Sequence, residues 1–384
     1  MLGKDQASTW ALVRKAVIIL WALYVISAVL SETAKPPGQP SSRNGPPSIT
    51  RNGNDGPSQN NFNSQGNFRG QGPGSKFTHK EETCTAGEQN PISAPDEHCD
   101  VTSAFTYETL TFTGESTGNS IDTFVVLPQG YDRNRAKPYK VVFSLHPAEK
   151  KSETSMQSFF KLMKWRLDAS MCSFMQVPSN DYILVYPSGG DRCYVNSMDG
   201  VTSMAEDNVV KDVVPYVLKN YNAATENNVC FGMSMGAYGC ILFGLKYPQI
   251  FPNVVVQSPG RYPRFVEWEE LISNEGPKQT SFSSRDFLLK YVFDEASYDS
   301  YDLCTVANSL QAGAAAKSNF VIFHGDKDPY AEQVDDIIGC LQDNHVPLKA
   351  FLVNGCGHGD LPMCMVSKPQ HTCFIQLMDA AISS

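Results

Sequence analysis

The sequence predicts an α/β fold in which a mostly parallel central sheet is flanked by helices. Three observations support this fold class. Short apolar runs recur along the chain, as expected of parallel strands that are buried on both faces. These runs alternate with segments of helical periodicity, and two earlier segments alternate apolar and polar residues like half-buried strands. The chain of 384 residues is long enough for one large domain or two modest ones.

The expected elements follow one another after residue 104. Half-buried strands are predicted at 105–112 and 121–126, and buried strands at 141–145, 183–186, 228–231, 253–256, 321–323 and 348–353. Helical patterns cover 156–171, 204–220, 237–247, 331–344 and 370–382. The span 259–316 is longer than a simple crossover. Its helical pieces and aromatic residues predict a helical cap inserted over the carboxyl edge of the sheet.

Residues 1–31 have the pattern of a secretory signal peptide. Arg14 and Lys15 precede an apolar run at 16–30, which ends at small residues near Ser31. This run is shorter than the ~20 apolar residues of a typical spanning helix. The alternative is an uncleaved signal anchor that tethers the protein to a membrane through residues 16–30. Either reading predicts a secreted or extracellular main domain.

Residues 32–82 differ in composition from the rest of the chain. They are rich in Pro, Gly, Ser, Asn and Gln, and they show neither helical nor strand periodicity. Such a segment buries too little apolar surface to offset the entropy of ordering it. We therefore expect a disordered linker here, followed by a globular domain at 83–384.

Charge and cysteine content narrow the class of protein. The formal net charge of −9 and the lack of long basic runs argue against a nucleic-acid partner. Eleven cysteines favour a secreted, disulfide-bonded chain, and they lack the paired spacing of a zinc site, so no metal is expected. Pairs close in sequence are the candidates for disulfides, namely Cys84 with Cys99, Cys172 with Cys193 and Cys356 with Cys364.

The strongest functional motif is Gly-Met-Ser-Met-Gly at 232–236, which lies between a predicted strand and a predicted helix. This is the context of a G-x-S-x-G nucleophile elbow, in which the glycines permit a tight turn and the serine hydroxyl is exposed. Ser234 is therefore the candidate nucleophile. Its place at a helix N-terminus predicts that the backbone N–H of Met235 helps to stabilise an oxyanion.

A catalytic serine needs a base and an acid, which follow it in this type of fold in the order Ser, Asp, His. His358 lies on a glycine-rich loop after the last predicted strand and is the expected general base. The strand at 321–323 runs into a turn with Asp326 and Asp328, and Asp328 is the candidate acid. Position in the sequence leaves Asp326 and Asp360 as alternatives.

Two further segments add a family resemblance. Gly-Met-Ser-Met-Gly-Ala-Tyr-Gly at 232–239, followed by Phe-Gly-Leu-Lys-Tyr-Pro at 243–248, resembles the esterase family that includes esterase D. The same region is similar to the feruloyl esterase and polyhydroxybutyrate depolymerase group. The resemblance covers about residues 120–260 and 320–360, and it implies the α/β-hydrolase fold.

In that group, Leu-His-Gly ends the strand that supplies the oxyanion loop, and His-Gly-x-x-Asp carries the acid. This chain has Leu-His at 145–146 and His-Gly-x-x-Asp at 324–328, so the resemblance favours Asp328 over Asp326. Pro147 is a departure, because proline has no N–H to donate and stands where the family has glycine. The resemblance therefore implies that Ala148 supplies the second oxyanion N–H.

These features predict a secreted serine carboxylesterase that acts through an acyl-enzyme and needs no metal or organic cofactor. The expected substrate is an ester in a small molecule, in the acyl groups of a polysaccharide or in a polyester. One alternative is a catalytically impaired α/β-hydrolase that serves in binding or adhesion, which Pro147 favours. A serine peptidase is the other alternative, although such enzymes usually carry a large extra domain for which this chain has no room.

Overall fold

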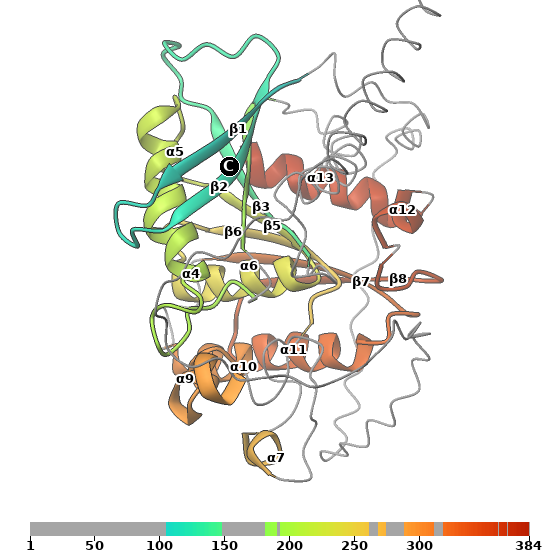
Figure 1. Cartoon of the computed structure of the whole chain (residues 1–384). Helices are drawn as coiled ribbons and strands as arrows, with labels where there is room; N and C mark the ends of the chain where they lie inside the picture. Colours follow the sequence, from blue (N-terminus) through green and yellow to red (C-terminus); the bar gives the residue numbers. More distant parts are fainter. Residues whose placement is uncertain are drawn as a thin grey trace, which may run out of the picture. The chain divides into compact units, whose positions relative to one another are not determined.

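A computed structural model of the chain describes residues 105–147, 181–189, 193–260, 268–273, 288–310, 318–359, 361–366 and 368–383 (Figure 1). All of these residues belong to the second of two compact units, Arg69–Ser384. The predicted leader (1–31) and linker (32–82) lie outside the described residues, as does the helix expected at 156–171.

In the described part of the chain, eight strands form one sheet in the order β1-β2-β4-β3-β5-β6-β7-β8 (Figure 1). Strand β2 is antiparallel to both β1 and β4, and the remaining neighbours are parallel, which confirms the predicted mostly parallel sheet. The strands are β1 (Phe105–Thr113), β2 (Ser120–Pro128), β3 (Lys140–Leu145), β4 (Tyr182–Pro187), β5 (Val229–Met233), β6 (Asn253–Gln257), β7 (Asn319–Gly325) and β8 (Leu348–Val353).

Helices cover both faces of this sheet (Figure 1). Their bounds are α4 (Ala205–Asp207), η1 (Asn208–Val213), α5 (Val214–Asn220), α6 (Met235–Lys246), α7 (Trp268–Ile272), η2 (Leu288–Val292), α9 (Glu295–Ser300), α10 (Leu303–Ser309), α11 (Ala331–Asp343), α12 (Leu361–Val366) and α13 (Pro369–Ser383). Helices α5, α6 and α11 pack on one face, α10 lies over α6 and α11, and α12 and α13 pack on the other face. Four of these elements, α7, η2, α9 and α10, belong to the segment that was expected to form a cap.

The helix expected over 204–220 is divided into α4, the π-helical segment η1 and α5. Pro215 lies in the first turn of α5. Proline lacks the N–H that would continue the α-helical hydrogen-bond ladder, and it displaces the preceding turn. The division at this point therefore follows from the sequence.

The central strands β3, β4, β5 and β6 are buried on both faces, as their composition predicts. The edge strand β8 was also expected to be buried, but only one of its faces is covered. In β3, Val141 and Phe143 belong to the apolar layer under α5 and α6, whereas Val142 belongs to the layer under α12 and α13. All three side chains are completely buried. Helix α6 is buried along nearly its whole length because the sheet covers one side and the α10 segment covers the other.

A buried carboxylate connects the nucleophile-bearing helix with the insertion. Glu206 is only 2% exposed and accepts hydrogen bonds from the hydroxyl groups of Tyr247 (2.5 Å) and Tyr301 (2.7 Å). Lys246 forms an ion pair with the same carboxylate. Tyr238 of α6 adds a hydrogen bond from its hydroxyl to the Tyr301 carbonyl at 2.6 Å. These bonds satisfy the buried charge and fix α6 against the segment around Tyr301.

Among the described residues the structure contains the predicted Cys356–Cys364 disulfide, together with two that proximity in sequence did not suggest, Cys230–Cys240 and Cys304–Cys340. The other two predicted pairs cannot be compared with the structure, because Cys84, Cys99 and Cys172 lie outside the described residues.

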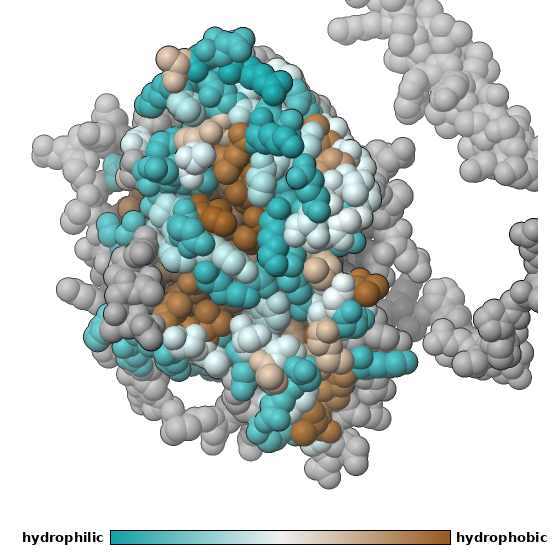
Figure 2. Space-filling model, turned by 90° about the vertical axis from the view of Figure 1, so that its left-hand side faces the viewer, coloured by the Kyte–Doolittle hydropathy of each residue, from teal (hydrophilic) through white to brown (hydrophobic). Residues whose placement is uncertain are grey.

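The face shown in Figure 2 interleaves hydrophilic and apolar residues. Among the described residues, the large apolar side chains that are exposed are Met198, Val201 and Ile272. Within the same residues, no helix is both long enough and apolar enough to cross a membrane.

The buried residue His371, on α13, should make the unfolding free energy of the protein decrease at acidic pH. It is 2% exposed, and neither of its ring nitrogens has a hydrogen-bond partner in the described part of the chain. Burial lowers its pKa from the ordinary 6.5. The unfolded chain therefore takes up this proton at a higher pH than the folded protein does. The resulting penalty is absent well above pH 6.5 and grows as the pH falls below it.

Between pH 7 and pH 5 the wild-type protein should lose unfolding free energy because of His371, and His371→Leu should lose less. We expect the two proteins to differ by on the order of 1 kcal/mol per pH unit. Urea unfolding at both pH values measures this difference. His345→Asn is the matched control, because His345 is exposed and its positive φ of 56° is one that asparagine tolerates. Equal pH dependence in wild type and His371→Leu would contradict the prediction.

Candidate active site

Ser234 is a one-residue corner between β5 and α6. Its φ of 54° and ψ of −117° are strained for a residue with a side chain. The corner is held from two sides, since Ser234 N–H donates to the Gln257 carbonyl of β6 (3.0 Å) and the Ser234 carbonyl accepts from Tyr238 N–H (3.0 Å). The side chain is at the carboxyl edge of the sheet, and the residue is 6% exposed.

The glycines on either side of this corner are required by close backbone packing. A Cβ atom on Gly232 would lie well under 3.0 Å from the Gly236 carbonyl, a separation that real Cβ atoms essentially never show. A Cβ atom on Gly236 would overlap the Leu145 carbonyl at the end of β3 in the same way. The elbow therefore packs directly against the strand that leads into the candidate oxyanion loop.

His358 and Asp328 come from the carboxyl ends of the adjacent strands β8 and β7. His358 Nδ1 is 2.9 Å from Asp328 Oδ2, and His358 Nε2 is 2.8 Å from Ser234 Oγ. An ionised carboxylate can only accept, so the proton of a neutral imidazole lies on Nδ1. Nε2 is then free to accept the hydrogen bond that Ser234 Oγ donates. The structure thus brings the three predicted residues into one hydrogen-bonded chain.

The environment of Asp328 keeps it charged at neutral pH. Its side chain is fully buried, and this burial by itself raises the pKa. The hydrogen bond from His358, the backbone N–H of Tyr330 at 2.9 Å and the Ser258 hydroxyl act in the opposite direction. Together they bring the pKa of Asp328 below its ordinary value.

The alternative acid, Asp326, has a different position. Its Oδ1 accepts a hydrogen bond from Gly355 N–H at 2.6 Å, and it forms an ion pair with Lys327. The bond from Gly355 lowers the pKa of Asp326 and ties the turn that precedes His358 to the end of β7. Asp326 thus contacts the backbone of the histidine loop, whereas Asp328 contacts the imidazole. Asp360 lies outside the described residues.

The chain after β3 is positioned by a buried histidine. His146 is 3% exposed, and its Nε2 accepts a hydrogen bond from Gly189 N–H at 2.9 Å. Its Nδ1 therefore carries the proton and donates to the Pro147 carbonyl at 2.9 Å. The hydroxyl of Tyr194 accepts from His146 N–H at 2.7 Å. These bonds fix the backbone up to Pro147.

The two predicted oxyanion donors differ in what the structure shows. Met235 is the first residue of α6, so its N–H is one of those that a helix leaves without an intrahelical partner. Ala148 lies outside the described residues. Of the two candidate oxyanion donors, the structure therefore places the Met235 N–H.

Two residues that contact the Asp328–His358 pair were not predicted. The ring of Tyr330 meets the His358 ring edge-on, with centroids 4.9 Å apart and an angle of 78°. Ser258 is completely buried, has a positive φ of 47° and follows β6 as Ser234 follows β5. The position after a strand was visible in the sequence, but no motif distinguishes Ser258 or Tyr330 from other residues in such turns.

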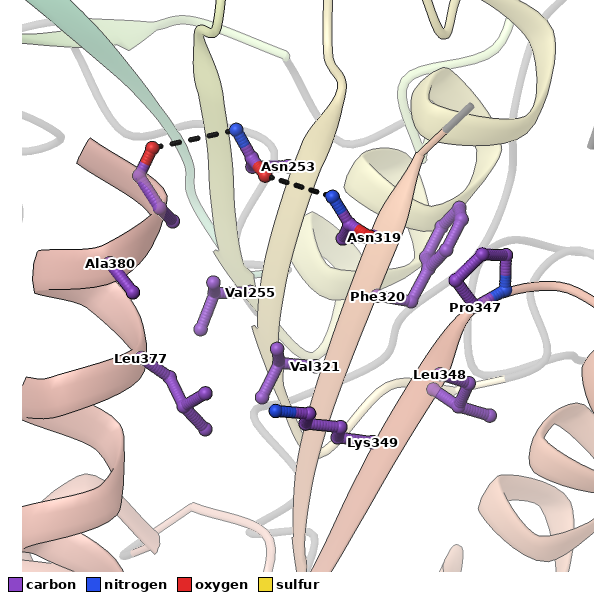
Figure 3. Close-up of a pocket in the computed structure, with 11 residues that line it drawn as sticks. Asn253, Val255, Asn319, Phe320, Val321, Pro347, Leu348, Lys349, Leu377 and Ala380 are labelled. Atoms are coloured by element: carbon purple, nitrogen blue, oxygen red, sulfur yellow. Dashed lines mark hydrogen bonds between the residues drawn. The ribbon is translucent and has the colours of Figure 1, made fainter. Parts of the chain in front are cut away.

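A separate cavity of about 360 Å³ lies at the opposite edge of the sheet, between α13 and the first residues of β6, β7 and β8 (Figure 3). Valine and leucine side chains form much of its lining, and Lys349 is the one ionisable residue among the described residues that line it. Its described lining holds no Ser, Cys, His, Asp or Glu side chain, in contrast to the carboxyl edge with Ser234, His358 and Asp328. In the described residues, no cluster of three or more His, Cys, Asp or Glu side chains could hold a metal ion.

Solved structures of esterases share this fold. The chain has a TM-score of 0.53 and 17% identity to a ferulic acid esterase, over 73% of this chain and 99% of the esterase. With a fluorophosphonate-binding serine hydrolase of Staphylococcus aureus the TM-score is 0.53 and the identity 18%, over 71% of this chain and 99% of the hydrolase. With an S-formylglutathione hydrolase from Agrobacterium tumefaciens the TM-score is 0.50 and the identity 15%, over 73% of this chain and 94% of the hydrolase. These likenesses confirm the α/β-hydrolase fold.

None of the curated protein sequences compared with the chain matches it. A family model described as "Putative esterase" matches residues 114–316, just over half of the chain. This span includes the elbow, the strands on either side of it and the whole insertion at 259–316. The resemblance that the motifs suggest is therefore confirmed: the chain belongs to this esterase family and is an ester hydrolase.

Proposed function

We propose that this chain is a secreted carboxylesterase in which Ser234 is the nucleophile, His358 the general base and Asp328 the orienting acid. The observation that carries the proposal is the hydrogen-bonded chain from Ser234 Oγ through the imidazole to the buried carboxylate. Membership of the esterase family supplies the reaction class.

In the proposed mechanism, His358 Nε2 takes the proton of Ser234 as Oγ attacks the ester carbonyl carbon. The charge of Asp328 stabilises the imidazolium that forms. The backbone N–H groups of Met235 and Ala148 would stabilise the tetrahedral oxyanion. The imidazolium then protonates the leaving alcohol, and water activated by His358 hydrolyses the acyl-enzyme. This sequence uses no metal or organic cofactor.

The substrate and location are proposed more broadly. Candidate substrates are a small-molecule ester, an acyl group on a polysaccharide and a polyester, and the structural likeness to a ferulic acid esterase fits this range. A signal peptide or anchor at 1–31, a linker at 32–82 and a catalytic domain at 83–384 with a cap at about 259–316 form the proposed organisation. The disulfides in the described residues support an oxidising, extracellular location.

One observation favours a second function, a binding or adhesion protein with impaired catalysis. Pro147 has no N–H, although the bond from His146 holds its carbonyl in a defined position. Loss of one oxyanion donor typically lowers turnover ~10²–10³-fold. A serine peptidase is the weaker alternative, and comparing hydrolysis of p-nitrophenyl esters with that of peptides separates it from an esterase.

We expect a fluorophosphonate probe to label the wild-type protein and a short p-nitrophenyl ester to be hydrolysed by it. Ser234→Ala should abolish both, because the alanine has no oxygen to form the covalent bond. Ser300→Ala is the matched control, since this serine lies on the exposed helix α9 and should leave labelling and hydrolysis unchanged. A folded wild-type protein that takes no label would support the binding function instead.

A further inference from the structure

Two of the disulfides close unusually short loops, and each loop contains one of the two residues that exchange the catalytic proton. The first, Cys230–Cys240, has a sequence separation of 10 and is called here the elbow disulfide. The second, Cys356–Cys364, has a separation of 8 and is called the histidine-loop disulfide. Ser234 lies inside the first loop and His358 inside the second.

The elbow disulfide joins the strand before the nucleophile to the helix after it. Cys230 is on β5 and Cys240 is on α6, with their Cα atoms 5.4 Å apart and both residues completely buried. The loop between them contains the corner at Ser234, whose positive φ costs free energy and persists only because the surroundings hold it. The bond therefore closes the strand–turn–helix unit covalently around its strained residue.

The histidine-loop disulfide acts on the other partner. The carbonyl of Cys356 accepts a hydrogen bond from Lys327 N–H at 2.9 Å, and a Cβ atom on Gly325 would overlap that same carbonyl. The loop thus packs on the end of β7. Cys364 is on α12, so the bond ties the start of the loop to the helix that follows it. His358 lies between these two fixed points.

The third disulfide in the described residues, Cys304–Cys340, differs in kind and is called the helix disulfide. It joins α10 to α11 across a separation of 36. Asp328 lies within that span, but the span also contains all of β7, and Cys340 is near the far end of α11. This bond holds two helices together without closing a tight loop around a reacting group.

We propose that the elbow disulfide and the histidine-loop disulfide are positioning elements of the active site, which hold Ser234 Oγ and His358 Nε2 at their hydrogen-bond distance of 2.8 Å. The proposal rests on the function proposed above for these two residues. Its physical basis is the sensitivity of proton transfer and attack to geometry, because a misplacement of about 1 Å can lower the rate roughly 10²-fold. Short covalent loops restrict such displacements more than a long one does.

Three double alanine variants test the proposal. They are Cys230→Ala with Cys240→Ala, Cys356→Ala with Cys364→Ala, and Cys304→Ala with Cys340→Ala as the matched control. For each variant, kcat and KM are measured on a short p-nitrophenyl ester well below the lowest Tm. Near-ultraviolet circular dichroism confirms folding, and the rate of fluorophosphonate labelling reports the reactivity of Ser234.

We expect both active-site variants to lose about 10- to 100-fold in kcat and in labelling rate, with KM changed by less than about twofold. The control should have a lower Tm and a kcat close to wild type. If the elbow variant does not fold, the histidine-loop variant decides, because only one cysteine of that pair, Cys356, is completely buried, whereas both cysteines of the elbow are.

The proposal is overturned if the folded histidine-loop variant keeps the wild-type kcat, or if the control loses as much kcat as that variant does. Ser234→Ala in the same assay separates this failure from failure of the proposed function. If Ser234→Ala is inactive and the disulfide variants are fully active, Ser234 remains the proposed nucleophile, and the disulfides do not position the active site. An active Ser234→Ala would overturn the proposed function itself.

Discussion

Asp328→Asn is expected to lower kcat for a short p-nitrophenyl ester about 10⁴-fold while the protein stays folded. Asparagine has nearly the same size and shape as aspartate, so the buried site can accommodate it without a new cavity. The loss would therefore come from hydrogen bonding and charge, and not from packing.

The hydrogen bonds around Asp328 give the reason. Its Oδ1 accepts from the backbone N–H of Tyr330, which can only donate, and its Oδ2 accepts from His358 Nδ1. In the variant, the amide oxygen must remain with Tyr330, so the amide NH₂ group faces His358. Nδ1 then has to accept, and the imidazole proton moves to Nε2. An imidazole in that tautomer cannot take the proton of Ser234.

Asp326→Asn is the matched control, because it changes the same chemical group two residues away. Asp326 bonds to Gly355 N–H, and an amide oxygen can still accept that bond. We expect kcat within a few-fold of wild type, measured with folding checked by circular dichroism. A large loss in Asp326→Asn with little loss in Asp328→Asn would show that the acid has been assigned to the wrong aspartate.

The sequence predicts the sheet and the elbow because both depend on local pattern. Apolar runs such as 141–145 identify buried strands, and Gly232 and Gly236 identify a turn that a side chain would block. The positions of Ser234 and His358 then follow from the predicted strands, because each residue lies in the turn or loop directly after one of them. These features need no knowledge of which distant residues meet.

The remaining features depend on such meetings. Position alone left Asp326 and Asp328 equivalent, because the two lie on the same turn and only their orientation separates them. Ser258 reaches Asp328, and Tyr330 reaches the imidazole, only after β6 and β7 pair and α11 begins. The Cys230–Cys240 bond was missed because a strand and the next helix must pack before their cysteines become neighbours.

Gly236→Ala should destabilise the fold by about 3 kcal/mol, since the new methyl group would overlap the backbone of Leu145. A flexible side chain could move aside, but a carbonyl at the end of a buried strand can shift only if β3 separates from the elbow. The same shift would displace His146 and the loop it positions. Activity should therefore fall even in the fraction that folds.

Urea unfolding measures the stability loss, and kcat per folded molecule measures the loss of function. Gly359→Ala is the matched control for stability, because a Cβ atom there meets nothing within 4 Å, so its unfolding free energy should stay within about 1 kcal/mol of wild type. If Gly236→Ala is as stable as this control, β3 and the elbow are not in the close contact described above. The candidate oxyanion site beside Met235 would then have to be built from a different backbone approach.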